Sequence, residues 1–252
     1  MATLHCNNRQ FKAIQAVIFD KDGTLANSAN FLRNLGQRRS RLIDAKIPGV
    51  QEPLLMAFGL DTTHINPSGL LAVGTRYENE IAAAAYVAET GRDWAEALEI
   101  VHSAFEEADR YMKRKADETP LFDQALPLLQ ALNNAQVKVG ILSSDTTANV
   151  QDFVQVYGLT PYIQLQMGCD RPPSKPNPQL VEQACAVLEV PLGATLMIGD
   201  SAVDMQMAQA AGMAGRVGVS WGWPSPINLA GAEVIVQQFD QIQVDQIQVV
   251  AN

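Results

Sequence analysis

Three short, continuous apolar runs constrain the fold of this chain more than any other feature of its sequence. Each run stops directly before a polar residue: Ala16–Phe19 before Asp20, Val137–Leu142 before Ser143, and Thr195–Gly199 before Asp200. Apolar runs without alternation are typical of parallel strands that are covered on both faces. Because helical patterns separate the later runs, the sequence predicts a doubly wound α/β fold with a mostly parallel sheet.

Further helices and strands fit this alternation. Three helices are expected, at Thr146–Tyr157, at Pro178–Leu188 with Asn177 as its cap, and at Ser201–Ala211. Three more strands are expected, at Tyr162–Met167, Val217–Ser220 and Glu233–Val236. Open sheets of this kind bind ligands at the carboxyl ends of their strands. The polar residues that follow the apolar runs are therefore the first candidates for a functional site.

The stretch from Asn27 to Glu118 interrupts the alternation. It is predicted to hold helices at Asn30–Ala45, Arg76–Glu89 and Trp94–Lys115, with a loop at Gly59–Gly74. Roughly 90 residues are too many for a crossover connection but suffice for a small domain. We therefore expect an α/β core of residues 1–26 and 119–252 and a helical cap of residues 27–118. The hinges are expected near Ala26–Ser28 and Thr119-Pro120.

Two aspartates follow the first run in the segment Asp20-Lys-Asp-Gly-Thr-Leu25. If the strand geometry persists, the carboxylates of Asp20 and Asp22 point to one side while Lys21 points away. Gly23 allows the backbone to turn sharply after the pair. Taken alone, this segment could be a solvated acidic turn. If the two carboxylates lie at the end of a buried strand, their repulsion is costly unless another group compensates it.

A second acidic group strengthens the case for a site. Asp200 ends another apolar run, and Asp204 falls in the first turn of the following helix, where it could simply complement the helix dipole. Several carboxylates at neighbouring strand ends form an oxygen-rich site that suits Mg²⁺. His64 and His102 lie in the presumed cap without a pairing that would indicate zinc.

Polar groups on other loops could bind an anion at the same edge of the sheet. Lys175 lies in Ser-Lys-Pro-Asn-Pro, between an extended segment and a helix start, although an isolated lysine is usually exposed to solvent. Ser143 and Ser144 offer hydroxyl and amide donors at the end of the second run, or could serve as helix-capping or turn residues.

Composition limits the partners of such a site. The net charge is −9, and no basic stripe suited to nucleic acid is visible. The sequence has no signal-peptide pattern, and its best apolar window, Ile81–Ala88, is too short to span a membrane. Its odd number of cysteines, at positions 6, 169 and 185, fits a reduced cytoplasmic compartment. An acidic protein that binds an anionic substrate must concentrate positive charge locally.

In order and content, four segments resemble the motifs of the haloacid dehalogenase-like hydrolase superfamily. They are Phe19-Asp-Lys-Asp-Gly-Thr-Leu25, Leu142-Ser143, Lys175-Pro-Asn-Pro178 and Gly199-Asp-Ser-x-x-Asp204. The segment from Pro120 to Leu132 is similar to the helix that precedes the second motif in members with an inserted helical cap. The resemblance covers residues from about Gln15 to Ala232. It implies a Rossmann-like core and a Mg²⁺-dependent, phosphoglycolate-phosphatase-like enzyme acting on a small phosphorylated molecule.

The resemblance also implies roles for the acidic residues. Asp20 would attack phosphorus and form an aspartyl-phosphate, and Asp22 would protonate the leaving oxygen and then activate water. Mg²⁺ would be held by Asp20, the backbone carbonyl of Asp22, and Asp200. Asp22 is expected to titrate above an isolated aspartate, since Asp20 and the phosphate are like charges nearby. Asp204 would orient Lys175 or metal-bound water.

Other residues would bind the substrate. Ser143 and Lys175 are expected to contact phosphoryl oxygens, with Thr24 and the Ser144 backbone as weaker candidates. Substrate discrimination is expected from the cap. There, Thr75 and Arg76 stand at a predicted helix N-terminus that favours anions, although Arg76 could be an ordinary exposed residue. Asp145 departs from the pattern, because an extra acidic residue near the second motif either repels an anionic substrate or faces solvent.

Three alternatives stay open on the sequence. A sugar-phosphate mutase of the same superfamily would keep the same motifs. A phosphonate hydrolase needs a cap lysine for a Schiff base, but Lys46, Lys113 and Lys115 fit a solvated helix face better. A receiver-like phospho-acceptor domain also binds Mg²⁺ and is phosphorylated on aspartate, but is about half this length and has no helical insertion. The dehalogenases themselves lack an aspartate at the position of Asp22, which favours phosphate as the group displaced.

Overall fold

The three apolar runs form the centre of a parallel sheet in the computed structural model, which describes residues 2–61 and 64–246. The sheet has six strands in the order β5-β4-β3-β6-β7-β8. Their bounds are β3 Ala16–Phe19, β4 Lys138–Ser143, β5 Leu165–Gly168, β6 Thr195–Gly199, β7 Gly215–Val219 and β8 Val234–Val236. Phe19 is in register with Ile141 of β4 and with Ile198 of β6. The carboxyl ends of these three strands therefore lie at one edge of the sheet.

Helices cover both faces of the sheet, which confirms the predicted doubly wound fold. The bounds are α7 Ala125–Asn134, α8 Thr147–Val156, α9 Gln179–Leu188 and α10 Ala202–Ala210. Val17 and Phe19 join one buried cluster with residues of α7 and α8, whereas Ala16 and Ile18 join another with residues of α9 and α10. This alternation along a fully buried strand explains why its sequence is apolar throughout.

The core helices differ from their predicted bounds by one residue, at both ends of α8 and α10 and at the start of α9. Helix α9 begins at Gln179, and Pro178, which was expected at the first helical position, stands at the N-cap. Asn177 therefore precedes the N-cap, but its amide oxygen still accepts a hydrogen bond from the Gln179 backbone N–H, the first of the helix, at 3.0 Å.

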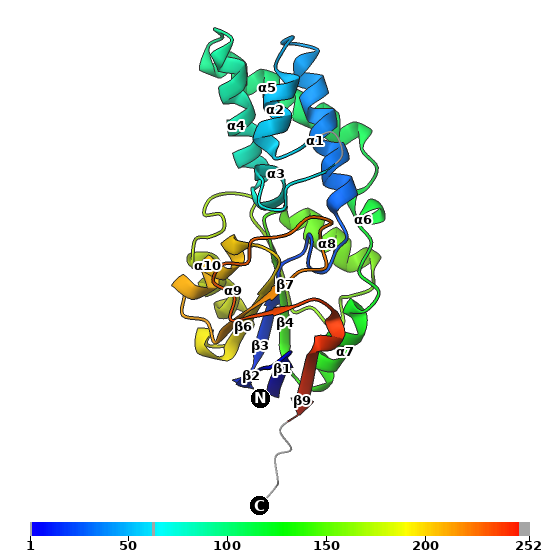
Figure 1. Ribbon diagram of the computed structural model, residues 1–252, viewed down its shortest axis with the longest axis vertical. Coiled ribbons are helices and arrows are strands. Elements are labelled where there is room, and N and C mark those ends of the chain that lie inside the picture. Colours follow the sequence, from blue (N-terminus) through cyan, green and yellow to red (C-terminus); the bar gives the residue numbers. More distant parts are fainter. Residues whose placement is uncertain (1, 62–63, 247–252) are drawn as a thin grey trace, which may run out of the picture.

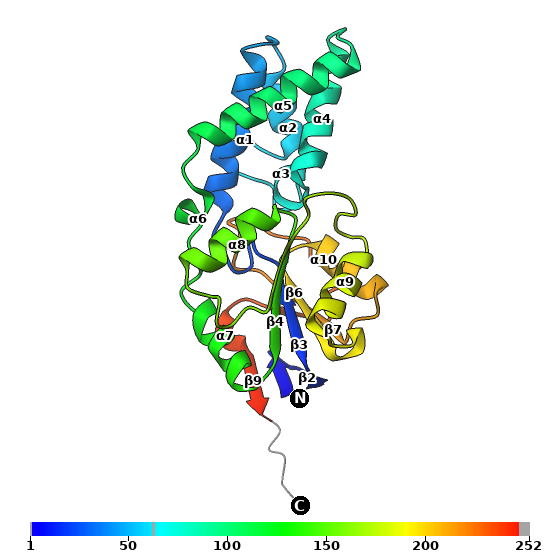
Figure 2. The same cartoon turned by 180° about the vertical axis from the view of Figure 1, so that it is seen from behind.

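The inserted stretch forms a helical cap with a hydrophobic cluster of its own. Its helices are α1 Ala29–Asp44, α2 Gln51–Phe58, α3 Leu70–Val73, α4 Arg76–Glu89, α5 Trp94–Tyr111 and α6 Lys115–Glu118. Figures 1 and 2 show these helices gathered at one end of the molecule, beyond the carboxyl ends of the parallel strands. The two connections to the core lie side by side, since the Asn27 N–H donates to the Pro120 carbonyl at 2.8 Å.

The cap departs from the expected helices in two places. The helix predicted over Trp94–Lys115 ends at Tyr111, because the backbone at Met112 and Arg114 is extended and carries the chain back toward α8. Helix α6 was not expected, and neither were α2 and α3. The latter lies within the loop predicted at Gly59–Gly74, of which residues 62–63 lie outside the described part of the chain.

A second, small sheet at the other end of the molecule was also not expected. It is antiparallel, with the order β2-β1-β9 and the bounds β1 Ala2–Cys6, β2 Arg9–Ile14 and β9 Ile242–Gln246. Short 3₁₀ turns at Leu192–Ala194 and Phe239–Gln241 precede β6 and β9. Figure 1 places this sheet far from the cap, so it supports the base of the core. No helix among the described residues is long and apolar enough to cross a membrane.

Candidate active site

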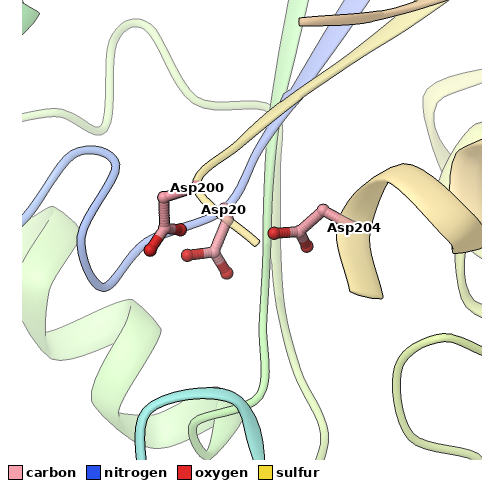
Figure 3. Close-up of side chains that lie close together, drawn as sticks. All are labelled: Asp20, Asp200 and Asp204. Carbon is pink, nitrogen blue, oxygen red and sulfur yellow. The ribbon is translucent and has the colours of Figure 1, made fainter. Parts of the chain in front are cut away.

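The central strands bring three aspartates together at one edge of the sheet. Asp20 continues the pairing of β3, because its backbone N–H donates to the Ile198 carbonyl at 2.9 Å. Asp200 follows β6, and Asp204 projects from the first turn of α10, whose N-cap is Ser201. Figure 3 shows the three carboxylates pointing toward one another. One oxygen of each lies within 4.8 Å of the others.

Lys175 joins two of these carboxylates. Its ammonium donates to Asp20 at 2.6 Å and to Asp204 at 2.7 Å, and its side chain is buried. Burial would lower the pKa of Lys175, but the two carboxylates outweigh this effect and raise it. The alternative of a solvent-exposed lysine is therefore wrong. Asp204 does more than complement a helix dipole, because it positions the lysine.

Two side chains donate hydrogen bonds to Asp200. One was expected to bind phosphate instead, and the other was not expected at the site. The Thr24 hydroxyl, predicted to contact phosphate, donates instead to Asp200 at 3.0 Å. The indole N–H of Trp223 donates to the other carboxylate oxygen, while the Trp223 ring packs in the hydrophobic cluster of the cap. Gly23 lies against both, with a φ of +83°, and a Cβ there would stand 2.4 Å from a carboxylate oxygen of Asp200. Only glycine fits this turn.

The charge balance of this group suits a divalent cation. Burial raises the pKa of Asp20 to about 6 even though Lys175 opposes the rise. Burial also raises the pKa of Asp200, and the charges of Asp20 and Asp204 add to the effect. Three buried carboxylates with one ammonium carry two uncompensated negative charges when ionised. A divalent cation bound by carboxylate oxygens would neutralise them, so the residues present fit such a metal.

Asp22 lies in a separate group of charges. Its carboxylate accepts from Lys21 at 2.7 Å and from Lys115 of the cap at 2.9 Å. Asp145 completes the group, at 2.8 Å from the Lys115 ammonium and 3.1 Å from that of Lys21. We refer to these four residues as the bridging cluster. It joins the cap to the loops after β3 and β4.

The bridging cluster corrects four expectations. Lys21 does not point away from Asp22, because β3 ends at Phe19 and strand alternation does not continue. Lys115 is not on a solvated helix face, and Asp145 neither faces solvent nor stands uncompensated. Burial alone would raise the pKa of Asp22, but Lys115 and Lys21 outweigh it, so that this pKa is lowered rather than raised.

A sequence profile of the haloacid dehalogenase-like hydrolases matches residues 14–212, which is most of the chain. The chain belongs to this hydrolase family. Among curated proteins, the phosphoglycolate phosphatase of Caulobacter vibrioides is 26% identical over 242 residues, covering 95% of this chain and 91% of that protein. The N-acetylmuramic acid 6-phosphate phosphatase of Pseudomonas putida is also 26% identical, covering 88% of this chain and 92% of that protein.

Solved structures agree on the fold of the hydrolase. A structure described as a predicted phosphoglycolate phosphatase from Haemophilus somnus superposes with a TM-score of 0.65 at 19% identity, covering 89% of this chain and 94% of that one. The family, the α/β core with a helical cap and the assignment as an enzyme are thus confirmed. The receiver-domain alternative is set aside, because the profile match runs through the helical cap.

Ser143, the last residue of β4, and Ser144 line a small pocket with Asp20, Asp200 and Lys175. The Ser143 hydroxyl accepts from the Asp145 backbone N–H at 3.1 Å, and the Ser144 hydroxyl donates to the carbonyl of Val73 in the cap at 2.8 Å. Neither serine caps α8, whose N-cap is Thr146. The pocket holds only about 20 Å³, which is close to the space of one water molecule. The cap is therefore closed over the site.

The start of α4 does not offer a free anion site. Thr75 is buried in a capping box, in which its hydroxyl accepts from the Glu78 N–H and the Glu78 carboxylate accepts from the Thr75 N–H. The same carboxylate group accepts from Ser174 of the core at 2.6 Å. Arg76 pairs with Glu80 at 2.8 Å and with Asp109. Thr75 is thus structural, whereas Arg76 lines cavities next to the bridging cluster.

Proposed function

We propose that this hydrolase cleaves small phosphate monoesters, with Asp20 as the nucleophile and a divalent cation, Mg²⁺, as cofactor. The observation that carries the proposal is the buried group of Asp20, Asp200 and Asp204 with Lys175 at the carboxyl edge of the sheet. Its relatives over most of the chain length include the two phosphatases named above. An electron-rich nucleophile, an ammonium and an oxygen-rich cation site together are what phosphoryl transfer requires.

Each residue of the group has a task in this mechanism. Asp20 attacks phosphorus in line, displaces the leaving alkoxide and becomes an aspartyl-phosphate. Lys175 holds Asp20 and then a phosphoryl oxygen, while Asp204 keeps the ammonium in place. The hydroxyl of Ser143, the last residue of β4, binds a second phosphoryl oxygen. Water then attacks the phosphoryl group and restores the Asp20 carboxylate.

Asp22 is the acid and base of the reaction. It protonates the leaving oxygen and later takes the proton of the attacking water. In the closed arrangement Lys21 and Lys115 favour its ionised form. A phosphoryl group entering beside Asp22 raises its pKa again, because a like charge favours protonation. The bridging cluster thus restrains Asp22 until the phosphoryl group arrives.

The metal would be held by Asp20, by Asp200 and by the Asp22 backbone carbonyl. When bound, it supplies positive charge that lets an anionic nucleophile approach an anionic phosphate. Thr24 and Trp223 fix the Asp200 carboxylate for this purpose. Because the pocket is closed, we propose that the cap opens about the paired connections at Asn27 and Pro120 to admit substrate.

The raised pKa of Lys115 argues against the phosphonate-hydrolase alternative. A Schiff-base lysine needs a neutral amine, and therefore a lowered pKa. Burial would lower the pKa of Lys115, but Asp145 and Asp22 outweigh it and raise the pKa. The three cysteines are free thiols, in keeping with the proposed reducing, cytoplasmic compartment.

The proposal is tested by assaying a panel of phosphate monoesters with and without Mg²⁺, using Asp20→Asn as the paired variant. We expect Mg²⁺-dependent release of phosphate by the native protein and a loss of at least about a hundredfold in kcat for the variant. Product analysis separates hydrolysis from mutase activity, since a mutase returns an isomer without free phosphate. Turnover retained by Asp20→Asn would contradict the nucleophile assignment.

A further inference from the structure

Two cavities lead away from the catalytic pocket between the cap and the core. The first holds about 70 Å³ and shares Asp22 and Ser144 with the catalytic pocket. The second holds about 400 Å³ and shares Arg39, Arg76 and Lys115 with the first. A volume of this size is in the range of pockets that bind small molecules. The cavities continue from the side of Asp22, the proposed proton donor to the leaving oxygen.

The larger cavity is lined by more positive than negative side chains, although the chain as a whole carries a net charge of −9. The cations are Arg39, Arg76, Lys113, Arg114 and Lys115. The carboxylates are Asp109, Asp145 and Asp152. Some of these cations also pair with carboxylates outside the lining, Arg76 with Glu80 and Lys113 with Glu118, so the lining offers an anion several guanidinium and ammonium donors rather than a large net charge.

Arg39 is the residue that points most directly to a ligand. It is only 6% exposed and lines both cavities. One end of its guanidinium donates to Asp109 at 3.2 Å, and its plane lies over the Phe105 ring with the central carbon 4.1 Å from the centroid. Its Nε has no hydrogen-bond partner among the described residues. A buried guanidinium with unused donor capacity beside two cavities is suited to bind an acceptor group of a ligand.

Arg76 adds a second guanidinium from a different helix. It belongs to α4, whereas Arg39 belongs to α1, and both pair with Asp109 of α5. Two guanidinium groups share this one carboxylate, and Arg76 reaches a second carboxylate in Glu80. Lys115 lines the same two cavities as the arginines and also contacts Asp22, which lines the catalytic pocket.

We propose that Arg39 and Arg76 form a subsite for a second anionic group, a carboxylate or a phosphate, on the leaving group of the substrate. The proposal rests on the phosphatase function above and narrows its substrate class to an extended anionic phosphate monoester. A two-carbon leaving group such as glycolate would fill little of the larger cavity. A chain or ring of about six carbons, with its phosphate at Asp20, extends past Asp22 and Lys115 toward the arginines.

The test compares phosphate esters that differ only in the distal group. One pair is 6-phosphogluconate and glucitol 6-phosphate, which have a carboxylate or a hydroxymethyl group at the far end. A second pair is fructose 1,6-bisphosphate and fructose 6-phosphate, and phosphoglycolate serves as the short anionic ester. The native enzyme is assayed with Mg²⁺, and the kcat/KM ratio within each pair is the readout. We expect a ratio of about tenfold or more in favour of the charged ester in at least one pair.

Variants assign that ratio to the subsite. Arg76→Gln, at a side chain that is 31% exposed, and Arg39→Lys, which keeps the buried charge, should each lower the ratio severalfold, mainly through KM. Because both esters of a pair meet the same variant, a loss of folded enzyme cancels in the ratio. Arg38→Gln is the matched control, since Arg38 is exposed on the same helix and contacts Tyr111 instead. It should leave the ratio unchanged.

The outcomes separate the subsite from the phosphatase function. A preference in the first pair identifies a carboxylate, and one in the second pair identifies a phosphate, and either supports the subsite. Ratios near one in both pairs, or a preference for phosphoglycolate over every longer ester, would overturn the subsite while leaving Mg²⁺-dependent hydrolysis intact. A ratio that neither arginine variant lowers would also overturn it. Failure to hydrolyse any ester, 4-nitrophenyl phosphate included, would overturn the proposed function and the subsite with it.

Discussion

Replacing Asp20 by asparagine in the metal-free protein exchanges a buried carboxylate for a neutral side chain of nearly the same shape. In the folded protein, burial raises the pKa of Asp20 from 3.8 to about 6; Lys175 opposes this rise and Asp204 adds to it. Because the pKa of the folded state lies above that of the unfolded state, folding favours the protonated carboxyl. Ionisation of Asp20 therefore weakens the metal-free fold.

The size of the effect follows from the shift. The stability linked to this proton is fully present below the unfolded pKa of 3.8 and is lost as the pH rises through about 6. A shift of about two pKa units corresponds to about 3 kcal/mol. Asparagine cannot ionise, so the variant does not lose this stability as the pH rises. The free energy of unfolding of Asp20→Asn, relative to the native sequence, should thus rise by about 3 kcal/mol between acidic and mildly alkaline pH.

Urea denaturation in EDTA, followed by tryptophan fluorescence over a series of pH values, measures this difference. Asp22→Asn is the matched control with the opposite sign. Lys115 and Lys21 lower the pKa of Asp22 against the effect of burial, so its stabilising charge is present above the unfolded pKa and is lost as the pH falls. Asp22→Asn should therefore be less stable than the native protein at neutral pH. If Asp20→Asn and the native protein lost stability in parallel across the series, the reasoning would be refuted.

Three further substitutions test other contacts of the site. Lys175→Met leaves two buried carboxylates unpaired, and should cost about 3–5 kcal/mol in urea denaturation at neutral pH; unchanged stability would contradict the buried ion pairs. Lys115→Gln should lower the free energy of unfolding by only about 1–3 kcal/mol, because Lys21 still contacts Asp22 and Asp145. Its control is Lys113→Gln, at a side chain that is 80% exposed, which should change that free energy by no more than about 0.5 kcal/mol. Gly222→Ala should cost about 1–3 kcal/mol in thermal denaturation and lower kcat, since a Cβ there would stand 1.8 Å from the carbonyl oxygen of Gly23, next to Asp22. Gly193→Ala, with open space around it, is the control, and equal losses at both glycines would rule out the steric explanation.

The sequence predicts best those helices and strands whose own residues show how they are buried or capped. Strands β3 and β6 follow from apolar runs because both faces of each strand are buried. Helix α4 was predicted with its observed bounds, Arg76–Glu89, and the capping box that Thr75 forms with Glu78 marks its start. The convergence of Asp20 with Asp200 was also predictable, since parallel strands end at one edge of the sheet.

Other features depend on partners that no local pattern reveals. Strand β1 pairs with β9, which lies at the far end of the described chain, so neither strand could be recognised from its neighbours. Lys115 looked like the last residue of a long helix, and only the turn back toward the core brings it to Asp22. Trp223 lies in no motif, and its contact with Asp200 arises from the packing of its loop against Gly23.

The central claim is that Asp20 carries the phosphoryl group during turnover. It is tested most directly by mixing the Asp22→Asn variant with Mg²⁺ and 4-nitrophenyl phosphate, whose leaving group needs little protonation, so that the first step does not depend on Asp22. The reaction is stopped in acid, and phosphoryl groups are located by peptide mass spectrometry. This variant lacks the proposed base for the second step, so the covalent intermediate should accumulate. We expect a phosphoryl group on Asp20, and none when Asp20→Asn is added to the same variant. Phosphate release without any phosphorylated Asp20 peptide, or a phosphoryl group on another residue, would contradict it.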